Sequence, residues 1–182
     1  MKRSINGFNI EEIATAVNLV QENSELGNFE FRIKNKWVSA GYNKSIVLDF
    51  YGGGKEDLTR EVPFVLNNGF PQVLMGRNEG ASPLEFILHG LAGCLTTTIV
   101  LYAAINGILI DKVNSTLKGD LDIQGFLGTK KTSRSGFKKI IVEIEIQGSL
   151  NEEEKQTLIN YAKHSPVFDV VTNGVPVQVL IK

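Results

Sequence analysis

The chain has 182 residues, enough for one domain with a sizeable core or for two tightly joined domains. Its 19 basic and 20 acidic residues leave a formal net charge of −1, which favours neither nucleic acid nor another polyanionic surface as a partner. The single cysteine excludes an internal disulfide and cannot by itself make a thiolate metal site. We therefore expect a cytoplasmic protein in a reducing compartment, with no metal site and no cofactor.

The first part of the chain predicts a helix followed by strands. Apolar residues at helical spacing across residues 10–23 predict an amphipathic helix that ends before Gly27. Three later segments predict extended structure, the first two of them joined as a hairpin by turn residues 41–44: 29–38, 45–51 and 62–66. The glycines at 52–54 lack the spacing of a phosphate-binding loop, so we expect a turn there.

Residues 82–107 predict one long helix, around which the chain is organised. Ser82 and Glu85 form a capping-box pattern around Pro83, and Asn106-Gly107 is a typical stop. No charged residue occurs between positions 86 and 110, so the helix is either covered by protein or lies in lipid. His89, three threonines and Asn106 dilute its apolar character, and no basic cluster flanks it. We predict a buried central helix, with a membrane span as the alternative.

Small residues mark one side of this helix. Gly90, Cys94, Thr97 and Leu101 share a face at helical spacing. An interior glycine costs about 1 kcal/mol relative to alanine, which suggests that another backbone comes close to it. The pattern predicts a helix-crossing seam that contains the sulfur atom.

The remaining sequence alternates strands and helices, which favours an α+β fold with antiparallel sheets. Alternation predicts strands at 113–123, 140–146 and 175–181. Residues 125–136 are polar, and their basic side chains are typical of a solvated loop. Asn151 opens a helix that reaches His164, and Ser165-Pro166 predicts a second cap.

Three blocks of this sequence resemble the signature of the OsmC/Ohr family, that is, osmotically inducible protein C and the organic hydroperoxide resistance proteins. The blocks are Ser82–Glu85 with Leu91–Thr96, Gly119–Asp122 with Gly125–Gly128, and Ser165–Phe168. The match in order of elements runs from about Phe29 to Ile181. It predicts an N-terminal helical extension at 1–28 and an OsmC-like domain at 29–182.

The resemblance implies a swapped α+β homodimer in which antiparallel sheets enclose two long central helices and the active sites lie at the subunit interface. It implies a thiol peroxidase that reduces organic hydroperoxides in oxidative or osmotic stress defence. In such enzymes the helix cysteine, here Cys94, attacks the peroxide, a second cysteine resolves the sulfenic acid, and a lipoyl-type dithiol reduces the disulfide. No nucleic acid and no membrane are implied as partners.

This sequence departs from the family pattern at several supporting positions. Ser165 stands where the resolving cysteine is expected, and Lys44 where an arginine is expected; a lysine can favour a nearby thiolate but cannot form the bidentate fork of arginine. Glu85 lies nine residues before Cys94, on the opposite side of the helix at about 100° per residue. His89 lies one turn after Glu85, within reach of it, and fits an interface or core position.

Two functions from different classes follow. One is a one-cysteine peroxidase in which an external thiol or lipoyl-type reductant reduces the Cys94 sulfenic acid. The alternative is a non-catalytic protein of the same fold that binds a small apolar ligand at the dimer interface, with Cys94 merely packed.

Overall fold

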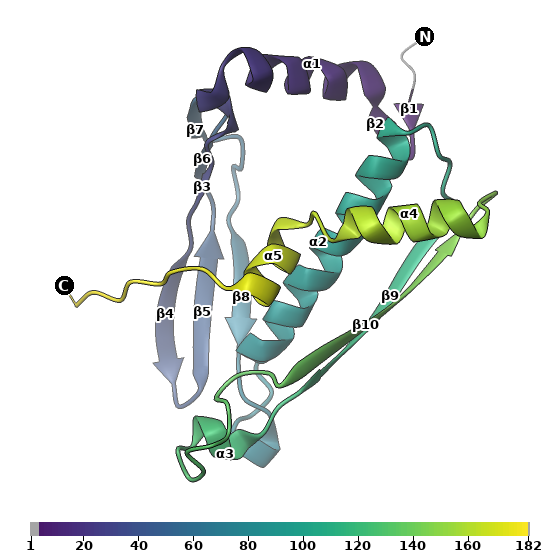
Figure 1. Ribbon diagram of the computed structural model, residues 1–182. Helices are drawn as coiled ribbons and strands as arrows, with labels where there is room; N and C mark the ends of the chain where they lie inside the picture. The colour runs from purple at the N-terminus through teal and green to yellow at the C-terminus, as the bar shows by residue number, and fades with distance from the viewer. Residues whose placement is uncertain (1–3, 182) are drawn as a thin grey trace. The chain divides into compact units, whose positions relative to one another are not determined.

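The computed structural model describes residues 4–181, which form a mixed α+β structure with antiparallel sheets (Figure 1). This confirms the predicted fold class. The helices are α1 (Ile10–Glu22), α2 (Pro83–Ile105), α3 (Ile123–Phe126), α4 (Glu152–Ala162) and α5 (Pro166–Asn173). The strands are β1 (Ser4–Ile5), β2 (Phe8–Asn9), β3 (Glu30–Phe31), β4 (Lys34–Ser39), β5 (Tyr42–Val47), β6 (Phe50–Gly52), β7 (Lys55–Asp57), β8 (Phe64–Asn68), β9 (Lys112–Asp120) and β10 (Lys139–Gln147).

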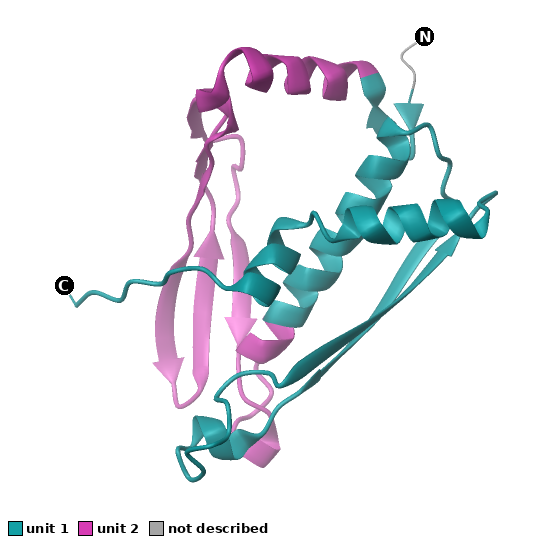
Figure 2. Cartoon of the chain, in the orientation of Figure 1, with its two compact units in different colours: residues 1, 3–10, 87–182 teal, residues 2, 11–86 magenta. Residues whose placement is uncertain are grey.

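The described residues divide into two compact units (Figure 2). Unit 1 comprises residues 4–10 and 87–181, and unit 2 comprises residues 11–86. The boundary that the sequence suggests between residues 28 and 29 stays a prediction.

Unit 2 contains two three-stranded antiparallel sheets, ordered β4-β5-β8 and β3-β6-β7. The predicted hairpin is confirmed as β4 and β5, but both predicted strands are interrupted, at residues 32–33 and at 48–49, and continue in the second sheet. Arg32 lies at this break and pairs with Glu30, Asp49 and Glu56, the last through two hydrogen bonds of 2.8 and 2.9 Å. The turn predicted in the glycine run joins β6 to β7, with positive φ at Gly53 and Gly54.

The predicted N-terminal helix is confirmed as α1. None of its residues is buried in the described chain, and Val17, Leu19 and Val20 are all exposed. The apolar stripe of α1 therefore lies largely at the surface of the described residues.

Unit 1 is organised around one face of α2. The side chains of Leu91, Leu95, Ile99 and Ala103, spaced four residues apart, form a core cluster with residues of β10 and α4. The opposite stripe of α2 is exposed at His89, Gly93 and Thr97. By length and mean hydropathy (1.7) α2 could also cross a membrane, and 22 % of its apolar window is buried among the described residues.

The β9–β10 ribbon covers this core with alternating inward and outward side chains, as the sequence predicts. Strand β9 ends at Asp120, earlier than predicted. Asp122 then caps the short helix α3, where its carboxylate accepts a hydrogen bond from the N–H of Gln124 at 3.1 Å. The polar connection therefore contains a helix that the sequence analysis missed.

The predicted final strand is wrong for the single chain. Residues 175–181 have no regular structure, and their alternating apolar side chains are exposed, Val177 by 79 % and Val179 by 86 %. A strand needs a neighbouring strand for its backbone hydrogen bonds, and this segment pairs with none within residues 4–181.

A hairpin of β1 and β2 ties the N-terminal end of unit 1 to the connection between α2 and β9. Asn6, at the turn with φ 51°, donates to the carbonyl of Ile108 at 2.8 Å and accepts from the N–H of Ile110 at 3.0 Å. Ile5 beside it is buried. One side chain thus satisfies two backbone groups of a distant loop.

We expect Asn6→Ala to lower the free energy of unfolding by about 1–3 kcal/mol, because it leaves a partly buried N–H and C=O without partners. Urea denaturation of the full chain measures this. The control Asn18→Ala, on the exposed surface of α1, should cause no loss. An Asn6→Ala protein as stable as the wild type would show that the hairpin does not hold this loop.

Candidate functional site

The capping box predicted at the start of α2 is present. The backbone N–H of Ser82 donates to the Glu85 carboxylate at 2.7 Å, and the N–H of Glu85 donates to the Ser82 hydroxyl at 3.3 Å. The bond from the Ser82 N–H to the carboxylate is the largest cause that lowers the pKa of Glu85 from its usual value, and a hydrogen bond with the Ser82 side chain is the second. Glu85 therefore caps the start of α2 in this structure.

Cys94 lies about three turns into α2, between exposed Gly93 and buried Leu95. It is half-buried and carries a free thiol. Within residues 4–181 no hydrogen bond reaches its sulfur; its carbonyl accepts one from the Thr98 hydroxyl at 2.7 Å. Cys94 thus lies at the border between the core face and the exposed stripe of α2.

The helix surface beside Cys94 is open within the chain. A Cβ built on Gly90 or on Gly93 would meet no atom within 4 Å. The sequence suggests a close backbone at these glycines, and the described chain supplies none. The exposed residues on this side of α2, His89, Gly93 and Thr97, form an uncovered strip. Of the predicted seam, Thr97 lies in this strip, whereas Gly90, Cys94 and Leu101 are partly buried.

Ser165 has a structural role in the chain. Its side chain is fully buried, with 0 % exposure, and its hydroxyl accepts a hydrogen bond from the N–H of Phe168 at 3.3 Å. It caps α5 ahead of Pro166, as the sequence predicts.

The remaining two predicted residues are His89 and Lys44. His89 is exposed, so it is not a core histidine of the single chain, and its position at an interface stays a prediction. Lys44 belongs to unit 2, where its ammonium group lies 5.6 Å from the ring centre of Tyr42 and its strand position is opposite Lys36 and Asn67. Among the described residues, hydrogen bonds and ion pairs join none of the five predicted site residues to another.

An aromatic group on α2 and α4 was missed by the sequence analysis. The rings of Tyr102 and Tyr161 stack with centres 4.5 Å apart, and His164 lies beside both at 6.1 and 6.4 Å. His164 directly precedes Ser165 in the chain. Tyr161 lies 59 positions after Tyr102 in the chain, and no periodicity or motif connects the two. The group could therefore not be predicted from the sequence.

Comparison with known proteins identifies the fold. The model of the OsmC-like protein family matches residues 76–180, which is more than half of the chain. No protein with a curated description matched.

Solved structures show the same fold at low sequence identity. An OsmC-like protein from Mycoplasma pneumoniae is 20 % identical, with 78 % of this chain and 86 % of that one covered and a TM-score of 0.59. An organic hydroperoxide resistance protein OsmC from Legionella pneumophila is 19 % identical (79 % and 90 % covered, TM-score 0.55). One from Elizabethkingia anophelis is also 19 % identical (78 % and 89 %, TM-score 0.52). The chain belongs to the OsmC-like family.

Proposed function

We propose that this protein is a one-cysteine thiol peroxidase that reduces organic hydroperoxides through Cys94. The observation that carries the proposal is the half-buried free thiol on the central helix α2, next to an uncovered strip of helix surface. The similarity to organic hydroperoxide resistance proteins from Legionella pneumophila and Elizabethkingia anophelis supports the same reaction class.

The reaction balances with this one cysteine and an external reductant. The Cys94 thiolate attacks one oxygen of the hydroperoxide; an S–O bond forms, the O–O bond breaks, and the alcohol leaves with a proton. A reductant thiol then attacks the sulfenic acid sulfur, forming a mixed disulfide and releasing water. The second thiol of a lipoyl-type dithiol displaces Cys94 as thiolate and closes its own disulfide. Ser165 cannot take the resolving step because a hydroxyl forms no disulfide.

We propose that the working form is a swapped homodimer in the cytoplasm, without membrane or nucleic-acid partners. Two features of the single chain support a second copy: the uncovered strip of α2, with open space beside Gly90 and Gly93, and the exposed alternating segment 175–181, which lacks a neighbouring strand. A second α2 against the strip and a partner strand beside the segment would cover both. The predicted enclosure of two central helices by the sheets belongs to this proposal.

A second candidate is a non-catalytic protein of the same fold that binds a small apolar ligand at the dimer interface. It is favoured by one observation: among residues 4–181 the Cys94 sulfur has no hydrogen-bond donor that would hold a thiolate. Peroxide turnover separates the two candidates.

The peroxidase proposal predicts that the wild-type protein consumes cumene hydroperoxide with dihydrolipoamide as reductant, and that Cys94→Ser abolishes consumption. The serine hydroxyl is a far weaker nucleophile than a thiolate at neutral pH. A colorimetric peroxide assay measures the rate, and Thr97→Ser, on the same exposed stripe, should retain it. Equal rates for wild type and Cys94→Ser would favour the ligand-binding candidate.

The dimer proposal predicts opposite effects of Gly93→Ala on the helix and on the assembly. Replacing an interior helix glycine by alanine stabilises an isolated helix by about 1 kcal/mol. A methyl group in the interface should instead weaken dimerisation about tenfold or more, as measured by sedimentation over a concentration series. Gly136→Ala, where the added Cβ would lie 3.7 Å from the nearest atom, is the control. An undisturbed Gly93→Ala dimer would contradict the helix crossing.

Ser165→Cys tests whether this position faces Cys94. The variant should lose about 1 kcal/mol of stability when reduced, because cysteine is a poor helix cap. After a hydroperoxide pulse the Cys94 sulfenic acid should condense with the new thiol, and intact mass should show two hydrogens lost per chain. The double variant Cys94→Ser with Ser165→Cys should show no such loss. A folded single variant that forms no disulfide would place Ser165 outside the resolving position.

A further inference from the structure

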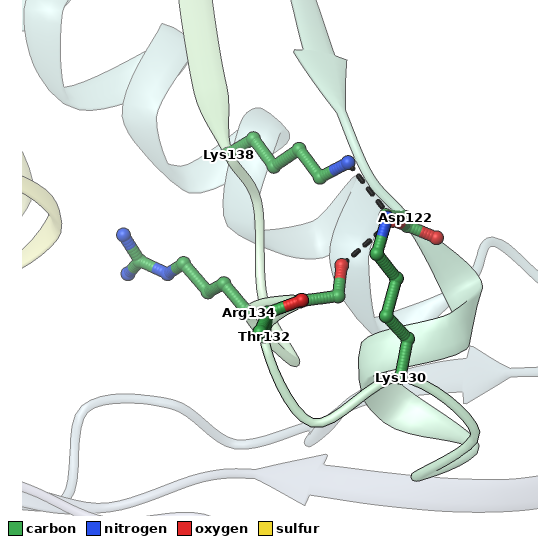
Figure 3. Close-up of a pocket in the computed structure, with 6 residues that line it drawn as sticks. Asp122, Lys130, Thr132, Arg134 and Lys138 are labelled. Atoms are coloured by element: carbon green, nitrogen blue, oxygen red, sulfur yellow. Dashed lines mark hydrogen bonds and ion pairs between the residues drawn. The ribbon is translucent and has the colours of Figure 1, made fainter.

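The connection between β9 and β10 forms an open, solvent-facing pocket in unit 1 that the peroxidase proposal does not use. It has a volume of about 400 Å³, within the range of roughly 300–1,000 Å³ that small-molecule sites occupy. Six side chains, all from this connection and its flanking strand ends, line it: Asp122, Lys130, Thr132, Ser133, Arg134 and Lys138 (Figure 3).

Asp122 orders this connection. Its carboxylate accepts hydrogen bonds from the Ser133 hydroxyl at 2.7 Å, the Lys138 ammonium group at 3.0 Å and the Gln124 N–H at 3.1 Å. The Ser133 bond is the largest of the causes that hold the pKa of Asp122 far below its usual value, so the group is a carboxylate throughout the neutral range. The Asp122 carboxylate therefore connects the start of α3 with Ser133 and Lys138 on the returning part of the loop.

Close backbone packing holds the same loop. A Cβ on Gly125 would lie 2.2 Å from the Arg134 carbonyl oxygen, so α3 approaches the returning chain as only glycine allows. Thr129 and Ser135 donate from their hydroxyls to the carbonyls of Gln124 and Gly125. The basic residues of this loop are exposed to solvent, as the sequence predicts, and internal hydrogen bonds hold the backbone that carries them.

The pocket carries an excess of positive charge. The lining contains three cationic side chains and one carboxylate, which leaves a formal excess of two positive charges. Lys138 is paired with Asp122, whereas within residues 4–181 neither Lys130 nor Arg134 takes part in an ion pair. Figure 3 shows Lys130 and Lys138 reaching towards Asp122, with Arg134 extending away from that carboxylate.

We infer that this pocket binds a small anion bearing a phosphate group, with Lys130 and Arg134 as its charge partners and Thr132 as a hydroxyl donor. A phosphate dianion would balance the two excess charges, and its oxygens accept from ammonium, guanidinium and hydroxyl donors together. The formal net charge of −1 for the whole chain argues against an extended polyanion. Free phosphate and phosphate esters share this chemistry, and the test distinguishes them.

The experiment titrates inorganic phosphate into the full-length protein at constant ionic strength and follows backbone amides by NMR. We expect saturable shifts confined to residues 122–138, with tighter binding of glycerol phosphate if the rest of the cavity holds an ester. The double variant Lys130→Gln with Arg134→Gln should weaken phosphate binding about tenfold or more. The control Lys163→Gln, an exposed lysine at the end of α4, should change it less than about twofold.

Three results would overturn the inference. The first is the absence of saturable shifts, because it means that phosphate has no defined site here. The second is an equal loss of phosphate affinity in the double variant and the control, because it means a general effect of charge. The third is tighter, loop-dependent binding of an RNA oligonucleotide or of anionic vesicles, which would mean a polyanion surface. If the double variant fails to fold by circular dichroism, Lys130→Gln and Thr132→Val are tested separately, and each should weaken binding.

Discussion

Burial of one face of α2 is the interaction on which unit 1 depends. Leu91, Leu95 and Ile99 enter a shared core with Leu158 of α4 and Ile146 of β10. Each fully buried side chain of this size contributes about 1.5–3 kcal/mol. Because these contacts orient α2 about its own axis, they also decide that Cys94 lies at the edge of the core and that the glycines beside it face outwards.

The same orientation leaves apolar surface of α2 exposed in the single chain. The helix carries no charge over most of its length, yet its second face is uncovered at Gly93 and Thr97. Residues 175–181 also expose apolar side chains, and among the described residues no strand pairs with this segment. A second copy of the chain accounts for both features through one cause, which is why the proposed dimer and the proposed site belong together.

Features that depend on near neighbours in sequence were predictable. The caps formed by Ser82, Asn151 and Ser165 are confirmed because capping is decided within four residues. The alternation of β10 likewise follows from one buried face. The final strand was wrong because alternation shows that a segment can pair but not whether a partner strand is within reach.

Features that depend on distant partners could not be read from the sequence. The ordered loop around Asp122 depends on Ser133, eleven residues later, and the strand breaks in unit 2 coincide with the ion pairs of Arg32. Neither has a periodic signature. Of the predicted site, the family resemblance gave Cys94, whereas the surroundings of its sulfur depend on packing that helix periodicity alone does not specify.

In the proposed mechanism, Cys94 reacts with hydroperoxides as a nucleophile in the folded protein. The most direct measurement is the intact mass of the wild-type protein after a pulse of one equivalent of cumene hydroperoxide, with dimedone present to trap a sulfenic acid. The account predicts one dimedone adduct per chain, located on Cys94 by peptide mapping and absent when the protein is pre-alkylated. An unmodified mass in the native protein, with Cys94 oxidised only after denaturation, would contradict the account and leave Cys94 as a packing residue.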